Sequence, residues 1–141
     1  MKRFFYILLL CAVLPVMVKN CEKNRAEIIP YVRVDIYKDI YADLGTLGPM
    51  QSMFLQGGYN GIVLFRDDEN NYHAYDRTCT LWPDHNKAVI ADTIFEGVLQ
   101  CPECKSRYLL INDGQVIDGP ANYSLVKYHT VVNYSMLHIY N

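Results

Sequence analysis

Three cysteines and one histidine in the second half of the chain are residue types that bind metals. Cys101 and Cys104 form a Cys-Pro-Glu-Cys motif, Cys79 lies 22 positions before Cys101, and His85 follows Cys79 by six positions. Three thiolates and one imidazole make a closed tetrahedral ligand set for zinc, and thiolates also hold iron–sulfur clusters. Cys79, His85, Cys101 and Cys104 are therefore the predicted metal ligands.

The segments around these residues have the patterns of β-strands. Alternating apolar and polar residues, or short apolar runs bounded by turn residues, are typical of strands, and the Asp-Gly pair at 113–114 suits a tight hairpin turn. Many short strands without a convincing amphipathic helix predict an all-β sandwich or barrel. Strands are expected at 31–37, 61–66, 72–77, within 89–100, at 107–111 and 115–118, and in a hairpin over 125–141, whereas 38–60 is expected to be mainly loop.

The predicted strands also explain how distant cysteines can meet. Cys79 follows one strand and Cys101 follows another, and the residues between them leave room for one hairpin. Two hairpin loops can therefore bring three thiols together in a small metal-binding subdomain. A shared ion would offset the cost of holding the two loops together.

Length and composition limit the remaining possibilities. The chain has 141 residues, a net charge of −2 and a pI near 6.0, so one globular domain is expected and no nucleic-acid partner is indicated. No Ser-His-Asp order, phosphate-binding loop or paired carboxylate pattern is evident. The chain is therefore not expected to be an enzyme, and no small-molecule substrate is indicated.

The first residues have the pattern of a secretory signal peptide. Lys2 and Arg3 precede a 15-residue apolar run at 4–18, which is short for a membrane span of about 20 residues. Cys21 ends this segment and polar sequence follows it, an arrangement that resembles a bacterial lipoprotein signal. Cys11 is the poorer candidate because apolar sequence continues beyond it.

We therefore expect an exported protein, either in the periplasm or anchored to a membrane of the bacterial envelope by lipid on Cys21. Stable anchoring takes more than one acyl chain. The predicted division of the chain is a signal peptide at 1–20, a linker at 21–30 and a β domain at 31–141.

The sequence from about Tyr72 to the C-terminus resembles a Rieske-type iron–sulfur domain. The resemblance is carried by "YDRTC" around Cys79, by "LQCPECKSRYLL" around Cys101, and by the Gly-Pro-Ala stretch at 119–121. In that family one hairpin loop carries Cys-x-His and a second carries Cys-x-x-His. The two cysteines hold one iron and the two histidines hold the other. The resemblance implies a Rieske-like antiparallel fold and single-electron transfer with a protein redox partner.

Two positions depart from the family pattern. Leu81 stands where the first histidine belongs, and leucine has no donor atom. Cys104 stands where the second histidine belongs. Three thiols remain, and His85 completes the set only if the first loop folds back.

Several interpretations of the thiols stay open at this point. The four residues hold an atypical [2Fe-2S] cluster that transfers electrons, or they hold one zinc ion in a structural or interaction module. Alternatively, two thiols form a disulfide, which export favours. A thiol oxidoreductase motif is the least favoured, because such motifs sit at a helix start and a strand follows here.

Overall fold

The computed structural model describes residues 28–81 and 86–141. Ten strands are described within these ranges, and the pairings between them are antiparallel. Leu110–Asn112 forms a short 3-10 turn. The all-β prediction is confirmed. Among the described residues, no helix has the length and hydropathy needed to cross a membrane.

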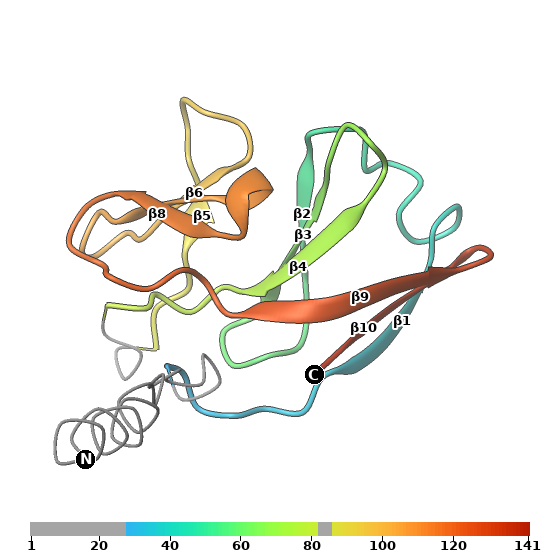
Figure 1. Ribbon diagram of the computed structural model, residues 1–141, viewed down its shortest axis with the longest axis horizontal. Coiled ribbons are helices and arrows are strands. Elements are labelled where there is room, and N and C mark those ends of the chain that lie inside the picture. Colours follow the sequence, from blue (N-terminus) through green and yellow to red (C-terminus); the bar gives the residue numbers. More distant parts are fainter. Residues whose placement is uncertain (1–27, 82–85) are drawn as a thin grey trace, which may run out of the picture.

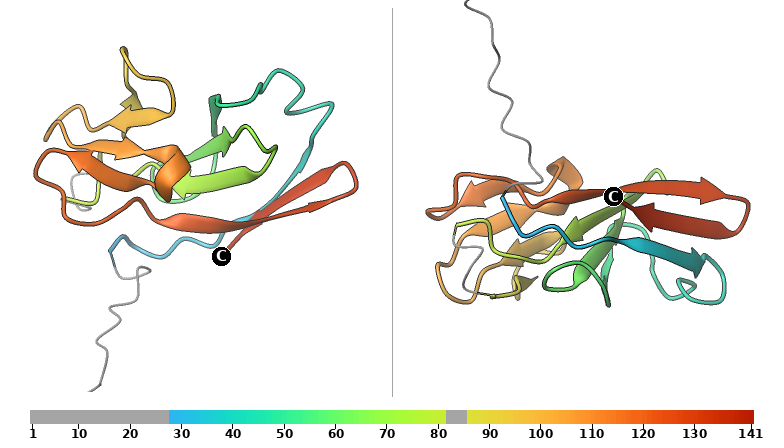
Figure 2. Two further views of the ribbon diagram at one scale, coloured as in Figure 1. Left: turned by 45° about the horizontal axis from the view of Figure 1, so that its top comes forward. Right: turned by 90° about the horizontal axis from the view of Figure 1, so that it is seen from below.

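The strands form two sheets that lie at opposite ends of the molecule (Figures 1 and 2). The larger sheet has the order β1-β10-β9-β4-β3-β2, and the smaller one has the order β5-β6-β7-β8. The strands of the larger sheet are β1 (Asp35–Asp39), β2 (Ser52–Leu55), β3 (Ile62–Arg66), β4 (Tyr72–Asp76), β9 (Lys127–Asn133) and β10 (Met136–Tyr140). Those of the smaller sheet are β5 (Ile90–Ala91), β6 (Val98–Gln100), β7 (Arg107–Leu109) and β8 (Gln115–Asp118).

Strand β3 is buried on both faces and contributes to two separate cores. Ile62 and Leu64 point into a core within the six-stranded sheet, whereas Val63 and Phe65 point into a core shared with the smaller sheet. Side chains alternate between the faces of a strand, so neighbouring residues serve different cores. This explains the continuous apolar run "IVLF", because neither face of the strand meets water.

The sheet core, as we call the first group, contains Val34, Leu44, Leu47, Ile62, Leu64, Tyr72, Ala74, Tyr128, Leu137 and Ile139. The thiol core, the second group, contains Val63, Phe65, Tyr75, Cys79, Val89, Leu99, Cys101, Tyr108, Leu110, Ala121 and Leu125. Two of the predicted metal ligands therefore belong to a buried hydrophobic cluster.

The hairpins predicted from turn chemistry are present. Asp113 and Gly114 both have positive φ, at 51° and 63°, and they end the connection between β7 and β8. The strand predicted at 107–111 stops at Leu109, because Leu110–Asn112 forms the 3-10 turn of that connection. The β3–β4 turn falls at 67–71, and the β9–β10 turn falls between Asn133 and Met136. These turns lie where the sequence predicts them.

Two further strand predictions need correction. The segment 38–60 is not only loop, because β2 pairs with β3 as the edge of the larger sheet. The strand predicted at 31–37 instead begins at Asp35. The residues before it bond to the side chain of Asn141, which accepts from the N–H of Val34 at 3.0 Å and donates to the C=O of Val32 at 2.8 Å. At these residues, hydrogen bonds to the Asn141 side chain thus take the place of the backbone pairing of a regular strand.

The predictions for the N-terminal segment lie outside the described residues. These are the signal peptide at 1–20, most of the linker at 21–30, and the roles of Cys11 and Cys21.

Candidate metal centre

Two hairpin loops from different parts of the chain form the candidate site. The first loop follows β4, where Val89 donates its N–H to the C=O of Arg77 at 2.6 Å and Cys79 donates to the C=O of Lys87 at 3.1 Å. These bonds, with a bridge between Thr78 and Ala88, pair the segment 77–79 with the segment 87–89. The loop therefore fixes the backbone on which the first thiol stands.

The second loop joins β6 to β7 and carries the Cys-x-x-Cys motif. Cys101 donates its N–H to the C=O of Ser106 at 2.9 Å, and Lys105 donates to the C=O of Cys101 at 3.1 Å. Lys105 takes a left-handed conformation with φ of 65°, which turns the chain back into β7. Both ends of the motif are thus held by backbone hydrogen bonds.

The structure brings the three thiols together. Their sulfur atoms all lie within 4.8 Å of one another, and Cys79 Sγ is 3.5 Å from Cys104 Sγ. Cys79 and Cys101 are buried, at 3% and 0% exposed, and Cys104 is half-buried. This confirms that sulfur atoms from two loops meet in space.

Two other predictions about this site, the His85 ligand and the disulfide, are not confirmed. His85 lies outside the described residues, so it stays a prediction as the fourth ligand. Cys79, Cys101 and Cys104 are free thiols in the structure, which gives no support to the disulfide interpretation.

The two cysteines of the second loop differ in acidity. Burial raises the pKa of Cys101 to about 12. Burial also opposes ionisation of Cys104, but hydrogen bonds from the Ser106 side chain and backbone and from the neighbouring thiols outweigh it, so its pKa is lowered. Because the thiolate is the metal ligand, Cys104 is the sulfur of this motif that ionises more readily.

Three hydroxyl groups surround the thiols. Tyr108 Oη lies 3.6 Å from Cys79 Sγ, accepts the N–H of Thr80 at 3.3 Å and lies 3.2 Å from Thr80 Oγ1. Ser106 Oγ lies 3.1 Å from Cys104 Sγ and accepts the N–H of Ala121 at 3.0 Å. Burial keeps the pKa of Tyr108 above its usual range, so its hydroxyl stays protonated and able to donate.

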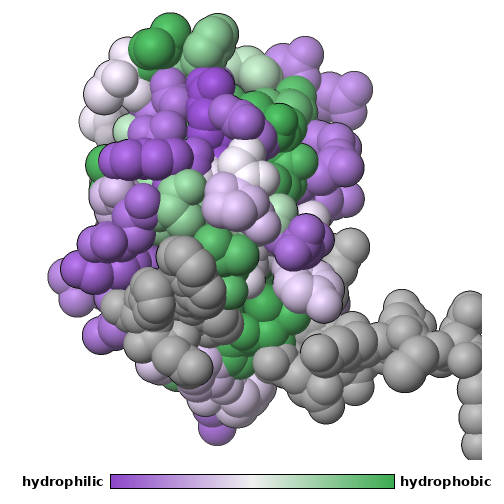
Figure 3. Space-filling view, turned by 90° about the vertical axis from the view of Figure 1, so that its left-hand side faces the viewer, coloured by the Kyte–Doolittle hydropathy of each residue, from purple (hydrophilic) through white to green (hydrophobic). Residues whose placement is uncertain are grey.

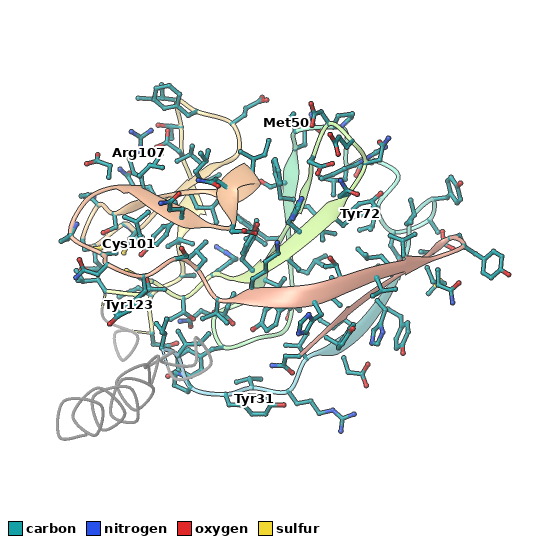
Figure 4. The ribbon with its side chains drawn as sticks, in the orientation of Figure 1. Tyr31, Met50, Tyr72, Cys101, Arg107 and Tyr123 are labelled. Atoms are coloured by element: carbon teal, nitrogen blue, oxygen red, sulfur yellow. The ribbon has the colours of Figure 1, made fainter. Side chains whose placement is uncertain are left out.

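These hydroxyl residues also tie the site to the irregular segment that contains the Gly-Pro-Ala stretch and precedes β9. Thr80 Oγ1 donates to the C=O of Tyr123, and Figure 4 shows Tyr123 and Cys101 at the same end of the molecule. The first thiol loop is thereby linked to residues more than 40 positions later in the chain.

The sequence-based site set did not include Thr80, Ser106 or Tyr108. A signal for two of them exists, because Cys104, Ser106 and Tyr108 recur at a spacing of two into β7. In the structure only Tyr108 of these lies on strand β7, and Cys104 and Ser106 lie in the loop before it. Thr80 carries no comparable signal, since its contact with Tyr108 depends on the packing of the first loop against β7.

The surface at this end of the molecule mixes polar and apolar side chains, as Figure 3 shows. Lys87 and Glu103 form an ion pair of 3.4 Å across the two loops, with both side chains half exposed. Exposed pairs of this kind contribute little to stability. The buried thiols and hydroxyls, rather than surface charge, therefore define the site.

Comparisons with known proteins place this fold in a family. The model of the family described as "Rieske [2Fe-2S] domain" matches residues 42–129. This range is more than half of the chain and includes both thiol loops. No curated protein is significantly similar to the chain.

Solved structures with a similar fold include an NADH-dependent nitrite reductase small subunit from Mycobacterium tuberculosis, at 20% identity and a TM-score of 0.47, covering 79% of this chain and 97% of that one. Another is the ferredoxin of carbazole 1,9a-dioxygenase from Nocardioides aromaticivorans, at 15% identity and a TM-score of 0.47, covering 77% and 97%. On the strength of the family match, the chain belongs to the Rieske [2Fe-2S] domain family.

Proposed function

We propose that this Rieske domain binds a metal centre through Cys79, Cys101 and Cys104 and uses it to transfer single electrons. The observation that carries the proposal is the meeting of three thiols, two of them buried, from two loops. Thiolate sulfur is a soft donor that suits iron and zinc. Family membership supports the electron-transfer role.

The described residues do not supply the full ligand set that the family name implies. A [2Fe-2S] cluster takes four protein ligands, and in Rieske domains two of them are histidines. The resemblance aligns Leu81 and Cys104 with those histidines. Within residues 28–81 and 86–141 the thiol group therefore offers three ligands of one type.

The surroundings of the thiols suit a redox role. Hydrogen bonds to ligand sulfurs and burial of the centre are two means by which proteins set the potential of such a site. Tyr108 Oη lies within hydrogen-bond distance of Cys79 Sγ. Cys104 Sγ donates to Ser106 Oγ, and this hydroxyl can donate in return once Cys104 is a thiolate. Both hydroxyls belong to the thiol core end of the molecule, so they are held by packing as well as by hydrogen bonds.

A second candidate function is a structural or interaction module that keeps the fold and holds zinc. The packing of Leu81 against the thiol core favours it, because hydrocarbon stands where the resemblance places a redox-cluster ligand. Zinc has no redox chemistry in proteins and would serve to join the two loops. The identity of the bound metal, iron or zinc, thus distinguishes electron transfer from a structural role.

Metal analysis of the full chain, purified without oxygen, tests the proposal. Iron bound to thiolates gives visible absorbance that bleaches on reduction with dithionite, and this is the expected result. Bound zinc without colour would support the structural module instead. A metal-free chain that takes up neither iron nor zinc would contradict metal binding altogether.

Export and lipid anchoring are part of the same proposal. The N-terminal pattern supports cleavage before Cys21, a linker to residue 30 and a β domain at 31–141, with a membrane reached through the lipid and an envelope protein as redox or binding partner. Mass spectrometry of the mature N-terminus should show an acylated Cys21. The variant Cys21→Ser should appear in the soluble fraction, and an unmodified wild-type N-terminus would contradict lipidation.

A further inference from the structure

We infer that the three thiolates hold a single metal ion, zinc or iron, rather than the two-iron cluster of the family. The inference rests on the proposed metal-binding function and concerns how many metal ions the site takes. Its basis is the disagreement between the ligand set described here and the one that a Rieske cluster uses.

The separation of the sulfur atoms fits one ion. With metal–sulfur bonds of about 2.3 Å, two sulfurs on one tetrahedral ion are roughly 3.8 Å apart. Cys79 Sγ and Cys104 Sγ are 3.5 Å apart, and all three sulfurs lie within 4.8 Å. Ligands on different irons of a cluster are farther apart, because the iron–iron separation adds to the two bonds. The resemblance assigns Cys79 and Cys104 to different irons, yet these two sulfurs nearly touch.

The short side chain of Cys104 explains this approach. A cysteine sulfur is attached directly to Cβ, whereas the donor nitrogens of histidine lie farther out on the ring. The backbone bond from Lys105 to Cys101 holds the loop closed, and Ser106 Oγ lies 3.1 Å from Cys104 Sγ. The sulfur is therefore held near Cys79, short of the position that an imidazole would reach.

The first loop has also lost its ligand for the second iron. Leu81 is partly buried and packs against the thiol core that contains Cys79 and Cys101. A hydrocarbon side chain offers no donor atom at this position. One iron position thus keeps both of its cysteines, while the other keeps neither of its histidines.

The remaining arrangement is a three-thiolate site for one soft ion. Cys79, Cys101 and Cys104 fill three tetrahedral positions, and the fourth is available to another donor. Electron transfer through this site requires the single ion to be iron, whereas zinc makes it structural. The number of ions is the same in both cases.

The test measures iron, zinc and acid-labile sulfide per chain in anaerobically purified full-length protein. A single-ion site gives about one zinc or iron per chain and no sulfide, whereas a [2Fe-2S] cluster gives two irons and two sulfides. The second result would overturn the inference while leaving metal binding intact. Absence of any metal would instead defeat the proposed function, so the two failures are distinguishable.

Variants connect the result to the two substituted positions. The double variant Leu81→His/Cys104→His restores the family ligands and is expected to gain two irons, two sulfides and the spectrum of a Rieske cluster. A folded double variant that still holds one ion would show that these positions do not set the number of metals, and would overturn the argument. Should it fail to fold, the sulfide content of the wild type decides alone.

A matched control lies inside the same loop. Glu103→Gln changes an exposed residue between the two cysteines and removes no thiol, so its metal and sulfide content should equal that of the wild type. Cys104→Ser removes one of the three thiolates and should lower retained metal at least tenfold through desalting. Full retention by Cys104→Ser would contradict a site built on three sulfurs.

Discussion

The two cores of this molecule lie on opposite faces of strand β3 and differ in the chemistry of their buried side chains. The sheet core consists of aliphatic and aromatic side chains, whereas the thiol core includes Cys79 and Cys101 among its buried members. Hydrocarbon burial stabilises the first by roughly 25 cal/mol for each Å² removed from water. In the thiol core, some of the buried atoms are cysteine sulfurs that can bind a metal. The stability of this core is therefore expected to depend on whether a metal is bound.

A buried carboxylate joins the two regions where strand β4 ends. Asp76 is fully buried and accepts hydrogen bonds from the backbone of Tyr59 at 2.6 Å, from the backbone of Thr78 at 2.8 Å and from Tyr128 Oη at 2.7 Å. Tyr128 belongs to the sheet core, and Thr78 precedes the first cysteine. The start of the thiol loop is therefore positioned from the sheet side, whether or not a metal is present.

The largest expected effects come from neighbouring residues of β3 that serve different cores. Leu64→Ala and Phe65→Ala should each destabilise the chain by about 3 kcal/mol or more, because both side chains are completely buried. Urea unfolding with and without excess zinc separates them. Zinc should stabilise Leu64→Ala as much as the wild type, but stabilise Phe65→Ala less. Equal responses would show that the cores do not differ in their coupling to metal.

Removing the metal should affect one end of the molecule more than the other. A ligand present at 100 times its dissociation constant stabilises the state that binds it by about 2.7 kcal/mol. After chelation, hydrogen exchange should therefore accelerate about 100-fold in β6 and β7, which flank the Cys-x-x-Cys loop. The amides of β9 and β10 provide the internal control. Equal acceleration of hydrogen exchange in both sheets would show that the two regions do not differ in their dependence on metal.

Local sequence patterns predicted the elements whose formation depends on near neighbours. Strand β3, the Asp113–Gly114 turn and the last hairpin follow from apolar runs and turn residues within a few positions. The meeting of the cysteines was predicted too, from the place of each cysteine just after a strand and from the family resemblance. Unlike the strands and turns, it depends on packing between distant parts of the chain.

Features set by distant contacts were not predictable in the same way. Strand β2 lies in a glycine-rich segment and exists through its pairing with β3. The extended chain before Asp35 bonds to Asn141, more than 100 positions away. The contact between Thr80 and Tyr108 likewise joins the first loop to strand β7 of the smaller sheet. In each case the partner determines the structure, and the local residues do not identify the partner.

A smaller effect is expected when a hydroxyl beside the thiols is removed. Tyr108→Phe deprives the N–H of Thr80 of its partner and removes a hydroxyl 3.6 Å from Cys79 Sγ. Stability should fall by about 1–2 kcal/mol, and metal affinity should fall about tenfold in a chelator competition assay.

Tyr75→Phe is the matched control in the same core. Tyr75 Oη donates to the C=O of Leu110 at 2.7 Å, away from the cysteine sulfurs, so its loss should lower stability similarly and leave metal affinity unchanged. Equal changes of affinity in both variants would show that Tyr108 acts only through packing.

The smallest effect should appear in acid, at the turn between β3 and β4. Burial opposes ionisation of Asp67, but hydrogen bonds from the Asn71 side chain, the His73 ring and the Asn71 backbone outweigh it and lower the pKa to about 2. A carboxyl with a lowered pKa stabilises the fold above its unfolded pKa of about 3.9, and this contribution disappears as pH falls through about 2.

Asp67→Asn should therefore cost about 1 kcal/mol at neutral pH and progressively less between pH 4 and 2, measured by urea unfolding. Asp68→Asn, at the exposed neighbouring position, is the control and should change little. Because Asp67 lies at the sheet end, its variant should leave metal content at neutral pH unchanged. A loss of metal in Asp67→Asn would show that a small perturbation of the sheet end reaches the thiols, and that the two regions act as one.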